Sequence, residues 1–281
     1  MTDSSPDVYG VIGHPVGHSR SPFIHGVFAR QTAQNMVYRL HDVLPNDFAP
    51  HVGHFFASGG LGLNVTVPHK PAAVEIADAL TPRAQRARAV NTLAMQLNRI
   101  LGDNTDGVGL VRDLCDNNAV VVANRRVLIL GAGGATRGIL EPLLQLEPEE
   151  ITIANRTVER AHALAKEFED LGKVRAFGFH EIPKRPYDVI INATSAALHG
   201  QMPDITPAIV DGASVCYDLS YAKDKTPFQK WCLEQRCSRA IGGLGMLVEQ
   251  AAESFFLWRG IRPDTAPVLA ALGVSTGSSA S

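Results

Sequence analysis

Residues 126–160 read RVLILGAGGATRGILEPLLQLEPEEITIANRTVER, and this stretch decides the fold. It opens on a short aliphatic run, 127–130, of the kind that forms a buried central strand of a parallel sheet. A glycine-rich segment, 131–135, follows at once, and apolar residues at helical spacing come next. A second apolar run, 151–154, ends on Asn155. The pattern predicts a strand, a glycine loop, a helix and a second strand, which together make one βαβ unit.

The glycine loop of this unit is typical of dinucleotide binding. Glycines let the backbone approach a pyrophosphate, and the helix that follows offers free N–H groups to it. The usual spacing is G-x-G-x-x-G, and Thr136 stands at its third glycine position. The polar cluster that begins at Asn155 lies 24 residues after Gly131, near the roughly 20 at which such folds place a ribose-binding side chain. The combination predicts a nucleotide site, whereas a lone glycine-rich turn would not.

The residues at the end of the second strand bear on the choice of cofactor. Enzymes that prefer NAD place an Asp or Glu there to bind the ribose hydroxyl, and this chain has Asn155 instead. Arg156 follows, and Arg160 lies four residues further on, so on a helix the two guanidinium groups would share a face. Together they can clamp a 2′-phosphate. The alternative is that both arginines are simply solvated, and the missing carboxylate favours NADP.

Length and composition predict a two-domain protein of the cytoplasm. The chain has 281 residues and a formal net charge of -2, which gives no sign of a nucleic-acid surface. Its first residues are polar and acidic, unlike a signal peptide, and no apolar run is long enough to span a bilayer. The four cysteines form no C-x-x-C pair, which favours reduced thiols. His14 and His18 flank Pro15 and Gly17 in a predicted loop, so no metal site is expected.

The first hundred residues predict a separate α/β domain that carries several polar positions. Ser19 and Ser21 precede a helix, where two hydroxyls can either cap the helix or bind a carboxylate, and the spacing leaves both readings open. Asn64 and Thr66 share one face of a predicted strand. Lys70 follows at the strand-to-helix turn, where α/β sites form, although a lone lysine there is more often solvated.

The predicted organisation is a two-domain α/β chain with a Rossmann-type, doubly wound nucleotide-binding domain. We expect residues 1–104 to form the N-terminal domain and residues 105–240 the nucleotide domain. Residues 241–281 should hold a C-terminal helix that returns to the first domain, followed by a disordered tail. Asp106 falls near a helix start, where a carboxylate is electrostatically favoured either as a cap or as a reacting group.

Eight short motifs, taken in order along the chain, resemble the shikimate dehydrogenase family. The match runs from about Tyr9 to Phe256 and is specific as a set, although each motif alone is weak. The motifs are Ser19-Arg20-Ser21-Pro22, Asn64-Val65-Thr66-Val67-Pro68-His69-Lys70, Ala89-Val90-Asn91-Thr92, Gly102-Asp103-Asn104-Thr105-Asp106-Gly107, Gly131-Ala132-Gly133-Gly134-Ala135, Asn155-Arg156-Thr157, Asn192-Ala193-Thr194-Ser195 and Gly243-Leu244-Gly245-Met246-Leu247.

The resemblance implies reversible reduction of 3-dehydroshikimate to shikimate by NADPH, in the biosynthesis of chorismate and the aromatic amino acids. It implies that Lys70 and Asp106 are the catalytic pair. The substrate-binding residues that it implies are Ser19, Ser21, Asn64, Thr66, Asn91, Tyr221 and Gln250. The cofactor-binding residues are Gly131, Ala132, Gly133, Gly134, Ala135, Asn155, Arg156, Thr157, Arg160, Thr194, Leu219 and Gly243.

Three positions depart from the family pattern, and none removes a reacting group. His69 stands where the family often has Phe, Leu219 where it often has Met near the nicotinamide, and Gly242 in place of a common Asp. The chemistry agrees with elementary expectations, because a lysine is ordinarily an ammonium near neutral pH and can give a proton to a forming alkoxide. The partners expected are small molecules, with no nucleic acid and no membrane, and the chain is expected to be a monomer or homodimer.

Two other functions compete with this interpretation. One is a quinate/shikimate dehydrogenase that uses NAD, and the other is a non-catalytic protein that senses NADP(H). Retention of both Lys70 and Asp106 speaks against a sensor, because sensing needs only the glycine loop.

Overall fold

The computed structural model describes residues 5–194, 196, 200–222 and 224–274. Ser195 of the quoted motif and the expected disordered tail, 275–281, therefore lie outside the described residues. The chain divides into two compact units: the first holds the residues up to Gly109 together with Leu247–Val274, and the second holds Leu110–Met246. We expected divisions after residues 104 and 240. The structure divides the chain inside two helices, α5 (Asp106–Arg112) and α9 (Leu244–Arg259).

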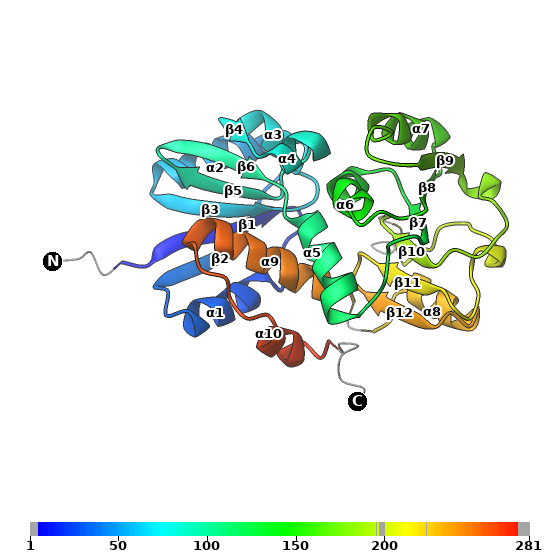
Figure 1. Ribbon diagram of the computed structural model, residues 1–281. Coiled ribbons are helices and arrows are strands. Elements are labelled where there is room, and N and C mark those ends of the chain that lie inside the picture. The colour runs from blue at the N-terminus through cyan, green and yellow to red at the C-terminus, as the bar shows by residue number, and fades with distance from the viewer. Residues whose placement is uncertain (1–4, 195, 197–199, 223, 275–281) are drawn as a thin grey trace. The chain divides into compact units, whose positions relative to one another are not determined.

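The first unit contains a mixed six-stranded sheet (Figure 1). Strand β1 runs parallel to both of its neighbours, β2 and β3, whereas β3, β5 and β6 are joined by antiparallel pairing. The order across the sheet is β2-β1-β3-β5-β6-β4. The strands are β1 (Asp7–Gly13), β2 (Met36–Asp42), β3 (Gly60–Val65), β4 (Ala79–Leu80), β5 (Thr92–Gln96) and β6 (Arg99–Asp103).

Apolar side chains build two separate cores in the first unit. Val52 and Phe55 of α2 pack with sheet residues such as Leu63, while Phe28 of α1 packs with Phe255 of α9. The C-terminal helix thus belongs to the first unit from Leu247 onward. The helices are α1 (Ser21–Gln31), α2 (Phe48–Ala57), α3 (Ala72–Ile76), α4 (Pro82–Ala87), α9 and α10 (Ala266–Ala271), and a 3₁₀ turn, Pro45–Asp47, precedes α2.

The second unit contains a six-stranded parallel sheet in the order β12-β11-β10-β7-β8-β9. Numbered from its own first strand, this order is 3-2-1-4-5-6 read from the β9 edge, which is the order of the dinucleotide-binding fold. The strands are β7 (Arg126–Leu130), β8 (Glu150–Asn155), β9 (Val174–Gly178), β10 (Val189–Asn192), β11 (Val215–Asp218) and β12 (Arg239–Gly242).

Both faces of this parallel sheet are apolar and covered. On β7, Val127 and Ile129 point into a core shared with α6 and α7, while Leu128 and Leu130 point into another shared with α8. Because both faces of the strand are buried, every residue from 127 to 130 is aliphatic. The doubly wound Rossmann-type fold is therefore confirmed. The helices are α6 (Gly134–Leu144), α7 (Val158–Glu167) and α8 (Pro227–Glu234), with a π-helical turn at Asp113–Asn117 and 3₁₀ turns at Phe179–Glu181 and Pro207–Ile209.

Candidate active site

Lys70 and Asp106 lie together in the first unit. Lys70 follows β3 in the turn toward α3, and Asp106 is the first residue of α5. The Lys70 ammonium donates to Asp106 Oδ2 at 2.5 Å, and the two side chains are 20% and 7% exposed. The backbone N–H of Asp106 donates to the side-chain oxygen of Asn104 at 3.1 Å, so Asn104 holds the helix start. The backbone of Asp106 is held by Asn104, and its carboxylate binds Lys70.

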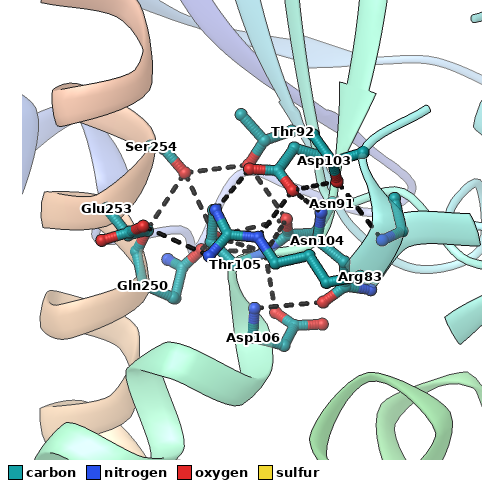
Figure 2. Close-up of polar contacts among 12 residues, drawn as sticks. Arg83, Asn91, Thr92, Asp103, Asn104, Thr105, Asp106, Gln250, Glu253 and Ser254 are labelled. Atoms are coloured by element: carbon teal, nitrogen blue, oxygen red, sulfur yellow. Dashed lines mark hydrogen bonds and ion pairs between the residues drawn. The ribbon is translucent and has the colours of Figure 1, made fainter. Parts of the chain in front are cut away.

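Asn91 fixes the second oxygen of that carboxylate, as Figure 2 shows. Its side-chain nitrogen donates to Asp106 Oδ1 at 2.9 Å, and it also lies 2.9 Å from Thr105 Oγ1 and 3.2 Å from Gln250 Oε1. Its side-chain oxygen accepts the backbone N–H of Thr105 at 2.8 Å. The expected catalytic carboxylate and two expected substrate-binding amides therefore belong to one buried hydrogen-bonded cluster.

Asn64 extends this cluster toward α1 and β2. Its nitrogen donates to Ser254 Oγ at 2.9 Å and to Thr92 Oγ1 at 3.2 Å, and its oxygen accepts from the Tyr38 hydroxyl at 2.7 Å. Both ends of the Asn64 amide are thus engaged within the unit. Burial raises the pKa of Tyr38 well above its usual value, although a hydrogen bond with Ser21 lowers it in part.

The two serines at the start of α1 have different surroundings. Ser21 is buried and is the first residue of the helix, so its hydroxyl does not cap α1. The hydroxyl of half-buried Ser19 accepts the backbone N–H of Ser21 at 3.2 Å instead. The capping alternative for Ser21 is therefore wrong, because Arg20 stands at the N-cap position and no side chain caps the helix there. Thr66 is half-buried and comes directly after β3.

The glycine loop of the second unit turns sharply after β7. Gly131 has a φ of +108°, and a Cβ there would lie 3.1 Å from the Ala193 carbonyl and 3.3 Å from Thr194 Cγ2. The loop therefore touches the end of the neighbouring strand β10, which is the point where the strand order reverses. Thr136 is fully buried at the third glycine position and donates its hydroxyl to the Gly131 carbonyl at 2.8 Å. It fits there because it satisfies its own polar atom.

The end of β8 is tied to the same loop through Asn155. Its side-chain oxygen accepts the backbone N–H of Ala132 at 3.3 Å, and its nitrogen donates to the Thr157 carbonyl at 2.8 Å. Arg156, Thr157 and Arg160 are exposed. Helix α7 begins only at Val158, so the expectation that Arg156 and Arg160 share a helical face is wrong. Arg156 lies in the turn before the helix, and Arg160 lies in its first turn.

The ends of β10, β11 and β12 form a connected row. Asn192 donates to Asp218 at 3.2 Å and accepts the Thr194 hydroxyl at 2.7 Å. The backbone N–H of Leu219 donates to the Asn192 carbonyl at 3.0 Å, and a Cβ on Gly243 would lie 2.2 Å from the Leu219 carbonyl. The expected cofactor residues Thr194, Leu219 and Gly243 thus lie just after the carboxyl ends of three adjacent strands.

Burial dominates the electrostatics of this row. It raises the pKa of the Asp218 carboxyl, and hydrogen bonds from Thr226, Ser220 and Asn192 offset the rise only in part. Tyr221 follows β11 in the second unit, whereas Ser19 and Ser21 belong to the first. Among the described residues, no group of three His, Cys, Asp or Glu side chains could hold a metal ion, and no described helix is long and apolar enough to cross a membrane.

Sequence reasoning missed several members of the first-unit cluster. Ser254 follows Gln250 by four residues on α9, so helical spacing alone could have placed the two hydrogen-bonding groups on one face. Tyr38 carried no signal, because a tyrosine in an edge strand is ordinary. The cluster also includes Arg83 and Asp103, whose contacts join α4 to the end of β6.

Three sequence-family models match the chain. The shikimate dehydrogenase substrate binding domain matches residues 11–93, the shikimate/quinate 5-dehydrogenase model matches 113–202, and the shikimate 5'-dehydrogenase C-terminal domain matches 243–272. A shikimate dehydrogenase (NADP(+)) of Methylococcus capsulatus is 52% identical, over 96% of this chain and 97% of that protein.

Two solved structures resemble the chain over nearly its whole length. The crystal structure of an Ael1 enzyme from Pseudomonas putida has a TM-score of 0.89 at 44% identity, covering 95% of this chain and 98% of its own. A shikimate dehydrogenase in complex with NADP⁺ has a TM-score of 0.84 at 35% identity, covering 97% of this chain and 96% of its own.

The fold and the site define a two-unit α/β protein of the dinucleotide-binding class, whose first unit holds a pair formed by half-buried Lys70 and buried Asp106. At 52% identity over nearly its whole length to a shikimate dehydrogenase, the chain belongs to the shikimate dehydrogenase family.

Proposed function

We propose that this protein is an NADP-dependent shikimate dehydrogenase, which reversibly reduces 3-dehydroshikimate to shikimate. The observation that carries the proposal is the 2.5 Å contact between Lys70 and Asp106, in a unit matched by the family's substrate binding domain. The relatives support the cofactor, because the one from Methylococcus capsulatus is named for NADP(+) and a solved relative holds NADP⁺. They favour neither the NAD-dependent quinate enzyme nor the sensor.

Lys70 is proposed to be the proton donor for the reduction. When bound, NADPH supplies a hydride to the ketone carbon, and the ketone oxygen must take up one proton to become a hydroxyl. The Lys70 ammonium can give that proton and steady the developing negative charge. Asp106 orients the ammonium through Oδ2, while Asn91 holds Oδ1, so the carboxylate cannot rotate freely. In the reverse direction Lys70 takes the proton back.

Uncharged polar side chains are proposed to bind the substrate. Ser19 and Ser21, helped by Tyr221, would hold the carboxylate, because the start of a helix favours negative charge. Thr66, Asn91 and Gln250 would hold the ring hydroxyls, with Asn64 among the substrate-binding residues. These groups match a ligand that carries one carboxylate and several hydroxyls.

The second unit is proposed to bind the cofactor. Residues 131–135 would receive the pyrophosphate, since Gly131 brings the backbone loop to the switch point of the sheet. Asn155, Arg156, Thr157 and Arg160 would surround the adenosine 2′-phosphate, and the absence of a carboxylate at position 155 removes the repulsion that an NAD-type residue would exert. The nicotinamide end would lie along the strand-end row of Thr194, Leu219 and Gly243.

Turnover of shikimate and quinate with each cofactor tests the proposal. We expect efficient oxidation of shikimate with NADP⁺ and a much lower catalytic efficiency with NAD⁺. Comparable efficiency with both cofactors together with turnover of quinate would establish the quinate/shikimate alternative, and binding of NADP⁺ without turnover would establish the sensor.

The cellular setting is also part of the proposal. We expect a cytoplasmic enzyme without nucleic-acid or membrane partners, acting as a monomer or homodimer. The formal net charge of -2 and the free thiols of all four cysteines support this setting. Size-exclusion chromatography with light scattering would decide between the two oligomeric states.

A further inference from the structure

Half-buried Arg83 and buried Asp103 form an ion pair close to the lysine–carboxylate pair, and Asp103 precedes Asp106 by three residues. Asp103 ends β6 and is fully buried. Arg83 of α4 binds it with two parallel bonds, from Nε to Oδ1 at 2.7 Å and from Nη2 to Oδ2 at 2.5 Å. Oδ1 also accepts the Thr81 hydroxyl at 2.5 Å and the backbone N–H of Asn104 at 2.8 Å. Figure 2 shows Arg83 beside Asp103 within the cluster that contains Asp106.

These contacts keep Asp103 charged in the interior. Burial alone would raise the pKa of the Asp103 carboxyl, but the hydrogen bonds and charge of Arg83, with Thr81 and the Asn104 N–H, hold it below its usual value. Arg83 itself has a raised pKa, because Asp103 and Glu253 outweigh its burial. A bidentate guanidinium–carboxylate pair fixes direction as well as distance. The end of β6 is therefore rigidly oriented relative to α4.

That orientation passes directly to the residues around Asp106. The backbone N–H of Asn91 donates to the Asp103 carbonyl at 3.0 Å. The Asn104 amide donates to the Ala89 carbonyl at 2.9 Å, while its oxygen accepts the Asp106 N–H at 3.1 Å. Both the backbone that carries Asp106 and the amide that holds its Oδ1 are thus anchored to Asp103. A shift of Asp103 would therefore move both Asp106 and Asn91, and with them the carboxylate that binds Lys70.

We infer that Arg83 is a positioning residue for the reaction, because its bidentate bond to Asp103 fixes Asp106 opposite Lys70. The inference rests on the proposed role of Asp106 in catalysis. Arg83 is proposed to touch no reacting atom and to act on Asp106 through Asp103. Small misplacements of catalytic groups can lower rates by about a hundredfold, so removal of Arg83 should lower kcat far more than it changes the KM for shikimate.

A double-mutant cycle isolates this role from general damage to the fold. In the otherwise unchanged protein, Arg83→Met should lower kcat by roughly 10- to 100-fold. In the Asp106→Asn background the same change should lower kcat by less than about threefold, because the residue through which Arg83 acts is already lost. Equal factors in both backgrounds would overturn the inference.

Two further variants make the result decisive. Arg83→Lys keeps the positive charge and loses the bidentate bond, so it should retain more activity than Arg83→Met and still show non-additivity with Asp106→Asn. It also carries the test if Arg83→Met does not fold. The matched control is Arg262→Met, because Arg262 binds Glu253, the second carboxylate of Arg83, at 2.8 Å but no atom of Asp103 in the contacts described. It should keep kcat within about twofold.

The same measurements separate this inference from the proposed function. If Asp106→Asn alone leaves kcat unchanged, the proposed catalytic pair is wrong. If Asp106→Asn lowers kcat and Arg83→Lys does not, the catalytic pair stands and only the positioning role of Arg83 is wrong.

Discussion

The two units hold their proposed functional groups by different means. In the first unit the groups are buried or half-buried side chains, and several bind one another, as Asn91 binds Asp106 and Asp106 binds Lys70. In the second unit the glycine loop is shaped by backbone contacts at Gly131, and the arginines proposed to meet a phosphate, Arg156 and Arg160, are exposed.

The difference matches the two tasks. Proton transfer needs donor and acceptor within hydrogen-bond distance, so a rigid and buried network suits it. A phosphate is bound by charge that also acts through solvent, and such binding tolerates mobile side chains but is weakened by salt. The first unit should therefore respond to mutation mainly through kcat, and the second mainly through cofactor affinity.

The largest effect is expected at Lys70. Lys70→Ala should lower kcat by roughly two or more powers of ten, because it removes the proposed general acid–base group. The KM for shikimate should change far less. Steady-state kinetics in the oxidative direction measures both values. A variant that keeps kcat and loses only affinity would make Lys70 a binding residue and would erase the contrast between the units.

The next effect is expected at Ser21. Ser21→Ala should weaken shikimate binding by about 1.5–3 kcal/mol, the range for a hydrogen bond to a charged group. Binding of NADP⁺ should not change. Equal losses of affinity for shikimate and for NADP⁺ would show that the substitution damages the start of α1 and does not remove a carboxylate contact.

Arg156 should give a smaller effect, confined to one cofactor. Arg156→Ala should weaken NADP⁺ binding by about tenfold, or ~1.5 kcal/mol, and leave NAD⁺ binding nearly unchanged. Added salt should weaken NADP⁺ binding more than NAD⁺ binding, because the arginine is exposed. Titration of each cofactor by fluorescence, with Arg160→Ala alongside, measures both effects. Equal losses for the two cofactors would show that Arg156 does not bind the 2′-phosphate.

The fold class of the second unit could be predicted from one stretch of sequence, residues 126–160. The strand β7 and its glycine loop have a strong local pattern, because a parallel strand buried on both faces is aliphatic throughout. Short or irregular elements had no such pattern. Strand β4 has only two residues, and α4 only six, so neither carries a full hydrophobic period.

The candidate site divides in the same way. Lys70 and Asp106 were placed together by family resemblance, and the structure gives the contact between them. The link from Arg83 to Asp103 joins residues twenty positions apart on two short elements, and nothing in local spacing indicates it. The helical pairing of Arg156 with Arg160 failed for a local reason, because the polar turn that begins at Asn155 delays the helix to Val158.

The smallest effect concerns two buried carboxylates, one in each unit. Their contributions to the free energy of unfolding should depend on pH with opposite signs. In the folded protein, burial raises the pKa of Asp103, but its contacts with Arg83, Thr81 and the Asn104 N–H lower it further, so the net pKa is below the usual value. The folded pKa of Asp218 is raised, chiefly by burial. As the pH falls, the unfolded chain takes up a proton at Asp103 before the folded protein does. At Asp218 the folded protein takes up the proton first.

Linkage gives the direction for each residue. The contribution of Asp103 is full above the ordinary aspartate pKa and is lost as the pH falls below it. The stability gap between the unchanged protein and Asp103→Asn should therefore narrow by about 1 kcal/mol between pH 6 and pH 3. The contribution of Asp218 is full at low pH and is lost as the pH rises through its folded pKa, so Asp218→Asn should shift in the opposite sense over the same interval. Urea unfolding of both variants and the unchanged protein at several pH values measures the two gaps. Shifts of the same sign would mean that the folded pKa values of the two carboxyls move in the same direction. The contrast between ion-paired Asp103 and desolvated Asp218 would then be wrong.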